Sequence, residues 1–375
     1  MRIAIDARAA AEVPAGRGRY VRELIRGLSR LPADHEFALY ARERWSAAEL
    51  DARFRWRTVG ARELAWPLVV GRGMSRSSDV ALACTSYAIT APWRLPGAAI
   101  VWDLAPFDRS LRTPAGSLLE RATLPIALRR CERLIAISAS TREELERRFA
   151  GARGRTTVAH PAADARFSPT PAAGEREVLD RHRLTRPYVL ATGTLEPRKN
   201  LPRLIEAFVG LPEHVRAGWQ LVLAGAAGWQ TDATFAAIQR HGELVRALGY
   251  VPDEELPCLY RQAELVCYPS LYEGFGIPVL EAMQCGTAVL TSNVSSMPEV
   301  GGEAARYADP RDVAAIRRAL AELLGDRGLR ERCAVAGLEQ ARRFDWDDTA
   351  RRVLDVLERL GAGSQRRAST HTLRR

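Results

Sequence analysis

The most specific stretch of the sequence runs from residue 273 to residue 281 and reads Glu-Gly-Phe-Gly-Ile-Pro-Val-Leu-Glu. Its carboxylates, Glu273 and Glu281, flank a Gly-x-Gly turn, and Pro278 suits the first position of a helix, which would place Glu281 in the first helical turn. The small loop lets the backbone amides of Phe275 and Gly276 approach hydroxyls or phosphate, and a carboxylate accepts well from sugar hydroxyls. A helix dipole that merely favours an acid would explain Glu281 but not the whole stretch. The pattern favours a ligand with hydroxyl and phosphate groups.

A second stretch, residues 193–200, reads Gly-Thr-Leu-Glu-Pro-Arg-Lys-Asn and separates a predicted strand from a predicted helix. A strand end, a glycine, two cations and a helix N-terminus favour an anion through unpaired N–H groups, helix dipole and formal charge. Arg198 can fork onto two phosphate oxygens, whereas Lys199 acts as a point charge. Lys199 is the only lysine among 55 cationic residues, which indicates a position that needs an ammonium group. The alternative is solvated surface charge.

A third stretch, residues 15–20, reads Ala-Gly-Arg-Gly-Arg-Tyr and opens a predicted helix after the first strand. It is only weakly similar to a dinucleotide-binding fingerprint, because Val21 stands where the third glycine would be. Gly16 and Gly18 could still let a phosphate or a sugar approach the helix N-terminus. A simple tight turn explains the pattern equally well.

Short apolar runs alternate with amphipathic segments along the chain, which predicts parallel sheets covered by helices. A segment rich in Pro, Ala and Gly interrupts the alternation after residue 160. We therefore expect an α/β protein with two Rossmann-like, doubly wound domains and a ligand at the carboxyl ends of the strands, in a cleft between them. The predicted strands are residues 2–6, 36–40, 55–59, 79–83, 98–102, 133–137, 156–159, 188–192, 220–224, 243–247, 265–268, 288–291 and 305–307. The expected divisions are an N-terminal domain (1–165), a linker (166–187), a C-terminal domain (188–345), a last helix (346–361) and a basic disordered tail (362–375).

Composition narrows the class of protein further. Apolar residues make up 47% and charged residues 27% of the 375 residues, and the sequence offers no apolar run long enough to span a membrane. The six cysteines include no C-x-x-C pair, which favours a reducing cytoplasm over a disulfide-stapled or exported protein. The net charge of +10 draws four charges from the last fifteen residues and forms no basic stripe interleaved with aromatic side chains. Nucleic acid is therefore not expected as a partner, whereas loose contact with an anionic membrane stays open.

Together these stretches resemble the family 4 retaining glycosyltransferases of the GT-B fold, in particular group 1, mannosyltransferase-like members. The resemblance is strongest from residue 188 to residue 310. It includes Leu-Gly-Tyr-Val-Pro-Asp-Glu-Glu-Leu at 248–256, Ile-Ser-Ala-Ser-Thr at 137–141, and Phe-Asp-Trp at 344–346. It implies a GT-B architecture in which the last helix crosses back to the N-terminal domain.

The resemblance also implies roles for individual residues. Arg198 and Lys199 would hold the donor diphosphate and, with Glu273 on the donor sugar, make up the catalytic group, whereas Glu281 would bind the nucleotide ribose. The base would lie near Gly249. The donor contacts implied in full are Gly16, Gly18, Trp102, Asp103, Gly193, Thr194, Gly249, Tyr250, Val251, Gly274, Phe275, Gly276, Ile277 and Glu281.

The implied reaction retains anomeric configuration and needs neither metal nor cofactor. The donor would be a nucleotide diphosphate sugar, with GDP-mannose the leading expectation. The acceptor would be a hydroxyl on a glycan, a lipid-linked sugar or a small molecule, as in bacterial polysaccharide biosynthesis. The expected location is the cytoplasm, with peripheral contact at the inner membrane face left open.

The pair Trp102-Asp103 departs from the family, whose members usually carry His-Asp there. An indole N–H donates but cannot accept a hydrogen bond or carry a proton. Trp102 therefore indicates a donor without the corresponding hydroxyl, such as a 6-deoxy sugar, or a side chain that turns into the core. It also leaves open a pseudo-glycosyltransferase or other non-catalytic GT-B nucleotide-binding protein. Charge alone suggests a further alternative, a protein that binds a polyanion or a lipid surface.

Overall fold

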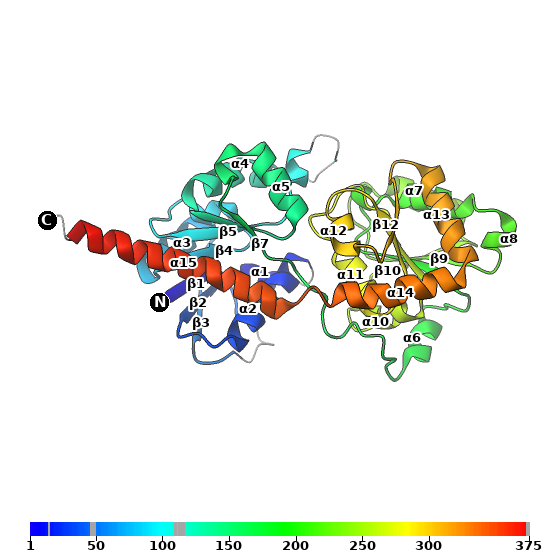
Figure 1. Cartoon of the computed structure of the whole chain (residues 1–375), viewed down its shortest axis with the longest axis horizontal. Coiled ribbons are helices and arrows are strands. Elements are labelled where there is room, and N and C mark those ends of the chain that lie inside the picture. The colour runs from blue at the N-terminus through cyan, green and yellow to red at the C-terminus, as the bar shows by residue number, and fades with distance from the viewer. Residues whose placement is uncertain (14–15, 46–49, 109–110, 112–116, 373–375) are drawn as a thin grey trace. The chain divides into compact units, whose positions relative to one another are not determined.

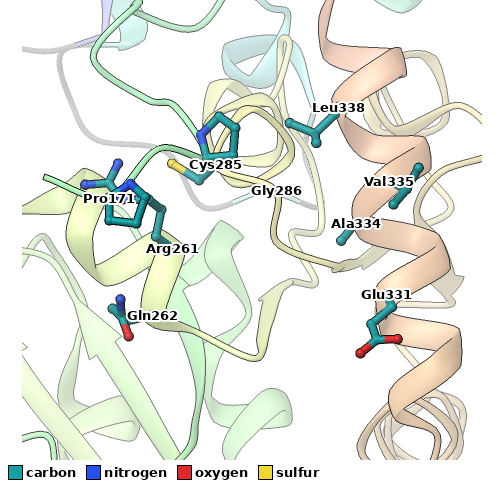
Figure 2. Close-up of a pocket in the computed structure, with 10 residues that line it drawn as sticks. Pro171, Arg261, Gln262, Cys285, Gly286, Glu331, Ala334, Val335 and Leu338 are labelled. Atoms are coloured by element: carbon teal, nitrogen blue, oxygen red, sulfur yellow. The ribbon is translucent and has the colours of Figure 1, made fainter.

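The computed structural model describes residues 1–13, 16–45, 50–108, 111 and 117–372 (Figure 1). The chain forms two compact units. The first unit takes the described residues of Met1–Arg109, Thr113–Pro161 and Asp345–Arg375, and the second takes Ala162–Phe344.

The first unit is built on a seven-stranded parallel sheet with the order β3-β2-β1-β4-β5-β6-β7. Strand β5 is buried along its whole length, which accounts for its apolar sequence Gly-Ala-Ala-Ile-Val. Ile3 of β1 lies opposite Phe37 on one side and Val80 on the other. The strands are β1 (Arg2–Asp6), β2 (Glu36–Ala41), β3 (Phe54–Thr58), β4 (Val80–Ala83), β5 (Gly97–Val101), β6 (Arg133–Ala136) and β7 (Thr156–Val158).

Helices cover this sheet (Figure 1). Three of them, α3, α4 and α5, share one apolar cluster with the 3-10 turn η1 (Tyr87–Thr90). The last helix, α15, packs along α2, and a Cβ at Gly27 of α2 would lie 2.7 Å from that of Ala350. The helices are α1 (Arg8–Glu12), α2 (Arg17–Arg30), α3 (Trp66–Ser77), α4 (Ser117–Arg130), α5 (Ala139–Arg148) and α15 (Trp346–Thr372).

The second unit contains a six-stranded parallel sheet with the order β10-β9-β8-β11-β12-β13. Its strands are β8 (Tyr188–Thr192), β9 (Gln220–Ala224), β10 (Val245–Gly249), β11 (Leu265–Tyr268), β12 (Val289–Ser292) and β13 (Arg306–Ala308). Its helices are α6 (Glu175–Arg181), α7 (Leu201–Val209), α8 (Glu213–Arg216), α9 (Asp232–Arg240), α10 (Leu256–Gln262), α11 (Ile277–Gln284), α12 (Met297–Gly301), α13 (Val313–Gly325) and α14 (Arg327–Ala341).

Each sheet has one point at which the strand order reverses. The reversal lies between β1 and β4 in the first unit and between β8 and β11 in the second. In doubly wound sheets, loops that leave a reversal point diverge and leave room for a ligand at the carboxyl ends of the strands. The two stretches with the strongest chemical pattern follow β8 and β11 directly, so the fold places both at this point of the second unit.

The architecture confirms the predicted α/β class of doubly wound parallel sheets, and the ends of β1, β8, β9 and β11 match the predicted strands. The segment expected as a linker, residues 166–187, instead contains helix α6, and Arg261 holds it against α10 through an ion pair of 2.5 Å with Glu175. The expected disordered tail continues helix α15 to Thr372, since residues such as Gln365 and Ala368 favour the helical state. No helix in the described part of the chain is both long enough and apolar enough to cross a membrane.

Candidate functional site

The loop after β8 is held in a fixed, unusual conformation. Gly193 has φ of +106° and Asn200 has φ of +61°, and of the other residues asparagine is among the few that tolerate such values. The Asn200 side-chain amide donates to the backbone oxygens of Pro269 (3.1 Å) and Pro310 (2.6 Å), which follow β11 and β13. The 3-10 turn η4 (Pro197–Lys199) lies between Gly193 and Asn200, so the conformation of this loop fixes where its two cations lie.

Close packing and hydrogen bonds also fix the conformation of the loop after β11. Gly276 has φ of +117°, and a Cβ there would lie 2.3 Å from Cε of Met297. Ser296 Oγ lies 3.0 Å and 2.6 Å from the carbonyl oxygens of Glu273 and Phe275. The backbone N–H of Glu273 donates to Ser295 Oγ at 3.1 Å. The Gly-x-Gly turn is thus needed for close packing, and it sets the position of the Glu273 side chain.

The two loops meet at Glu273, whose side chain is buried. Its Oε1 accepts hydrogen bonds from Lys199 Nζ (2.8 Å), Tyr268 OH (2.9 Å) and Ser270 Oγ (2.9 Å). Its Oε2 accepts from the guanidinium of Arg198. The structure therefore brings the three predicted catalytic residues into one hydrogen-bonded cluster, and the protein itself supplies most of the donors that Glu273 can accommodate.

A second carboxylate holds the outer side of Arg198. Glu196 Oε1 lies 2.7 Å from Arg198 NH2, and Trp229 Nε1 donates to Glu196 Oε2 at 3.4 Å. Trp229 belongs to the loop after β9, which reaches this position because Gly228 has no side chain: a Cβ there would lie 2.5 Å from the carbonyl oxygen of Leu195. The cluster thus balances two cations against two carboxylates.

Electrostatics keep this cluster charged. Burial by itself would raise the pKa of Glu273, but the charges of Arg198 and Lys199 and their hydrogen bonds lower that pKa to about 2. Burial lowers the pKa of Lys199 from its usual range, and the neighbouring Glu273 opposes this shift. A buried carboxylate that stays ionised in this way holds both cations in place for an incoming anion.

Glu281 is held separately, on helix α11. Its Oε2 accepts a hydrogen bond of 3.0 Å from Tyr260 OH, which itself lies 2.7 Å from Thr192 Oγ1 at the end of β8. Helix α11 begins at Ile277 rather than at Pro278, so Glu281 falls outside the first turn, contrary to the prediction. Because dipole effects fade within the first turn, the helix dipole contributes little to Glu281, whereas the phenol of Tyr260 contacts its carboxylate directly.

Comparison with known proteins now adds to this geometry. Residues 178–340 match the family described as "Glycosyl transferases group 1". This part of the chain is therefore similar to the group 1 glycosyl transferases.

Curated relatives agree with that assignment. Over 230 residues the chain is 39% identical to the O-antigen chain mannosyltransferase B of Escherichia coli, an alignment that covers 60% of each protein. Over 247 residues it is 34% identical to the D-inositol 3-phosphate glycosyltransferase of Salinispora tropica, covering 60% of this chain and 50% of that protein. The chain therefore matches these relatives over about three fifths of their length or less.

Solved structures show the same fold. The sucrose-phosphate synthase of Thermosynechococcus elongatus is 20% identical with a TM-score of 0.77, and the alignment covers 97% of this chain and all of that one. The HepE protein of Anabaena, solved with UDP and glucose, is 19% identical with a TM-score of 0.75, covering 96% of this chain and 99% of that one. The chain accordingly has the GT-B fold predicted from its sequence.

The other donor contacts predicted in the second unit lie on the loops at the carboxyl ends of β8, β10 and β11. Gly193 N donates to the carbonyl oxygen of Ala224, and Gly225 N donates to that of Gly249, so these loops lie against one another. Tyr250 is 70% exposed beside the buried Val251. The remaining predicted contacts at this edge are Thr194, Gly274, Phe275, Gly276 and Ile277.

The predicted contacts of the first unit are Gly16, Gly18, Trp102 and Asp103. Gly16 begins α2 with φ of +55° and open space beside it, whereas a Cβ at Gly18 would lie 1.8 Å from the carbonyl oxygen of Val13. Gly18 is therefore required by local packing, and Gly16 is free to face a ligand. Asp103 Oδ1 accepts from the backbone N–H of Ala105 at 3.0 Å.

Trp102 packs inside the first unit. Its ring is 6% exposed and forms an edge-to-face contact with Tyr20, with centroids 5.0 Å apart. Its Nε1 donates to the carbonyl oxygen of Cys84 at 2.7 Å, and Arg17 lies over the ring. Of the two interpretations of this residue, the geometry favours the one in which the indole belongs to the core.

Several residues of the site escaped sequence reasoning. Tyr268 ends β11 and Ser270 follows it, a position at the carboxyl end of a strand that could have marked them. Glu196 lies within the predicted anion loop but carries the wrong charge for such a site. Nothing in the local pattern points to Trp229 or Tyr260, because their contacts come from other strands and helices.

Proposed function

We propose that this protein is a retaining, metal-independent glycosyltransferase that moves a hexose, with mannose as the first choice, from a nucleotide diphosphate sugar to an acceptor hydroxyl. The observation that carries the proposal is the cluster of Arg198, Lys199 and Glu273 at the strand reversal of the second unit. The similarity to the group 1 glycosyl transferases and to the E. coli mannosyltransferase supports both the reaction class and the sugar.

The leaving diphosphate would be stabilised by formal charge. Arg198 offers a planar guanidinium, and Lys199 offers a compact ammonium group. Two of the three N–H groups of Lys199 donate to Glu273 and Tyr268. Charges that are already positioned need no reorganisation as negative charge develops on the leaving group. This arrangement can replace a divalent cation, which explains why we expect activity without added metal.

Specificity for the rest of the donor would come from the surrounding loops. Glu281 accepts a hydrogen bond from Tyr260, and a carboxylate is also a suitable acceptor for ribose hydroxyls. The exposed ring of Tyr250 offers a stacking surface for the base. GDP-mannose is the leading donor, and the acceptor is a hydroxyl on a glycan, a lipid-linked sugar or a small molecule.

A surface of the first unit suits peripheral contact with an anionic membrane, where lipid-linked acceptors would be found. Helices α3 and α4 both pack against η1, and large apolar side chains on or just before them are exposed: Leu64, Leu68, Val69, Leu118 and Leu119. Exposed arginines on or next to the same two helices form no ion pair in the described part of the chain: Arg62, Arg72, Arg76, Arg121, Arg129 and Arg130. Apolar side chains combined with unpaired cations favour the interface of an anionic bilayer.

A binding panel tests the donor site. Thermal unfolding is followed with GDP, UDP, ADP and dTDP, because a ligand at about a hundred times its Kd stabilises a protein by about 2.7 kcal/mol. We expect GDP to raise Tm most, and transfer from GDP-mannose to continue in EDTA. If none of the four nucleotides shifts Tm, the proposal fails. Activity that EDTA abolishes and Mg²⁺ restores would refute the metal-free mechanism.

A further inference from the structure

Glu196 has no part in the proposed transfer, yet its carboxylate lies 2.7 Å from the arginine expected to bind phosphate. Arg198 NH2 pairs with Glu196 and Arg198 NH1 with Glu273. Two carboxylates therefore balance the charges of Arg198 and Lys199. A diphosphate that approaches Arg198 from the NH2 side competes with Glu196 for that part of the guanidinium.

The two carboxylates are anchored very differently. Glu273 is 7% exposed and accepts from Lys199, Tyr268 and Ser270 in addition to Arg198. The Glu196 side chain is 17% exposed, and its partners in the described part of the chain are Arg198 and the long contact of 3.4 Å to Trp229. Glu196 is therefore the carboxylate that gives way more easily.

The backbone around Glu196 is tied to a neighbouring loop. Leu195 N donates to the carbonyl oxygen of Ala226 at 2.9 Å, and Gly228 N donates to that of Leu195 at 3.0 Å. These bonds join the loop after β8 to the loop after β9. Rotation of the Glu196 side chain would therefore release Arg198 without breaking a backbone hydrogen bond.

We propose that Glu196 is a competing internal anion, which pairs with Arg198 and yields this arginine to the donor diphosphate. The inference rests on the proposed function, because it takes Arg198 as a phosphate ligand. A diphosphate carries more negative charge than one carboxylate and therefore displaces Glu196, but it binds less tightly than it would if Glu196 were absent. Glu196 therefore sets the strength of nucleoside diphosphate binding, and with it the ease of product release.

Calorimetric titration of Glu196→Gln with GDP tests the competition. Removal of one neighbouring negative charge is expected to tighten GDP binding about tenfold and to leave guanosine binding unchanged. Glu196→Asp keeps the charge and is expected to change GDP affinity less than threefold. Glu206→Gln is the matched control, since Glu206 is exposed on α7 and its loss removes the same charge away from the cluster.

The outcomes separate this inference from the proposed function. Binding of GDP by the wild type with an unchanged or weakened affinity in Glu196→Gln overturns the competition and leaves the proposed function standing. Equal tightening in Glu206→Gln also overturns it, because the effect would then be one of net charge. If UDP, ADP or dTDP binds in place of GDP, the same titration is made with that nucleotide. Failure of the wild type to bind any of the four refutes the proposed function and the inference together.

Discussion

The two units carry buried carboxylates at equivalent points of similar sheets, yet they surround them with opposite chemistry. Asp6 ends β1 at the strand reversal of the first unit and accepts from the backbone N–H (3.0 Å) and hydroxyl (2.9 Å) of Thr85. Glu273 lies at the reversal of the second unit among cations. Burial raises the pKa of Asp6, whereas Arg198 and Lys199 overcome burial and lower the pKa of Glu273 to about 2.

The difference shows how one fold separates structure from chemistry. Neutral donors around Asp6 join the loops after β1 and β4, and this contact holds the sheet edge together. The two cations beside Glu273 carry one charge more than this carboxylate, and the more weakly anchored Glu196 balances that charge, so that an anion able to compete with Glu196 can bind there. Mutations around Asp6 are therefore expected to change stability, whereas mutations around Glu273 are expected to change ligand binding as well.

Truncation of the two carboxylates should give the largest contrast. Glu273→Ala leaves two cations without their shared partner, and the loss of one member of a buried pair typically lowers the free energy of unfolding by about 3–5 kcal/mol. Asp6→Ala leaves unpaired neutral donors, for which about 1–3 kcal/mol is expected. Urea unfolding of both variants at pH 7 measures the difference. Equal losses would show that the surrounding charges add nothing.

Acidification should change the contributions of Glu273 and Asp6 to the free energy of unfolding in opposite directions. The pKa of Glu273 in the folded state lies below its ordinary 4.5, so its stabilisation is present above pH 4.5 and is lost as pH falls toward 2. At about 1.4 kcal/mol per unit this loss is about 3 kcal/mol. The raised pKa of Asp6 acts oppositely, since protonation on acidification removes the penalty of a buried charge. Urea midpoints between pH 7 and pH 3 should therefore fall less steeply for Glu273→Ala than for the wild type, and more steeply for Asp6→Ala.

Single substitutions of the cations should weaken binding of a nucleoside diphosphate far more than binding of the nucleoside. Arg198→Ala and Lys199→Ala are each expected to weaken nucleoside diphosphate binding by about 1.5–3 kcal/mol, the usual contribution of a charge-assisted hydrogen bond. Binding of the nucleoside alone should change little, because it carries no phosphate. Calorimetry with both ligands makes the comparison, with the exposed Arg240 of α9 replaced as a control. Equal losses for the two ligands would move these residues away from the phosphates.

The sequence was informative where a residue's role depends on its own loop. The family resemblance implied Arg198, Lys199 and Glu273 as one group, and the residues themselves placed Arg198 and Lys199 in a loop after a predicted strand, where parallel sheets bind ligands. The contacts of Trp229 with Glu196 and of Tyr260 with Glu281 depend on packing between distant segments, which leaves no local pattern. Helix α4 escaped prediction for a different reason: it contains Pro125, which ordinarily ends a helix.

The smallest effect is expected at Trp102, which stands where the family resemblance implies a histidine. Trp102→Phe keeps an aromatic ring against Tyr20, removes the N–H that donates to the carbonyl oxygen of Cys84, and replaces the indole with a smaller ring. One lost hydrogen bond of this kind is expected to lower stability by about 1 kcal/mol. Because the indole is used inside the first unit, the ratio of transfer rates from matched 6-hydroxy and 6-deoxy donors should not change. A shifted ratio in a variant that folds normally would show that the ring meets the sugar after all, and would restore a 6-deoxy donor as the preferred substrate.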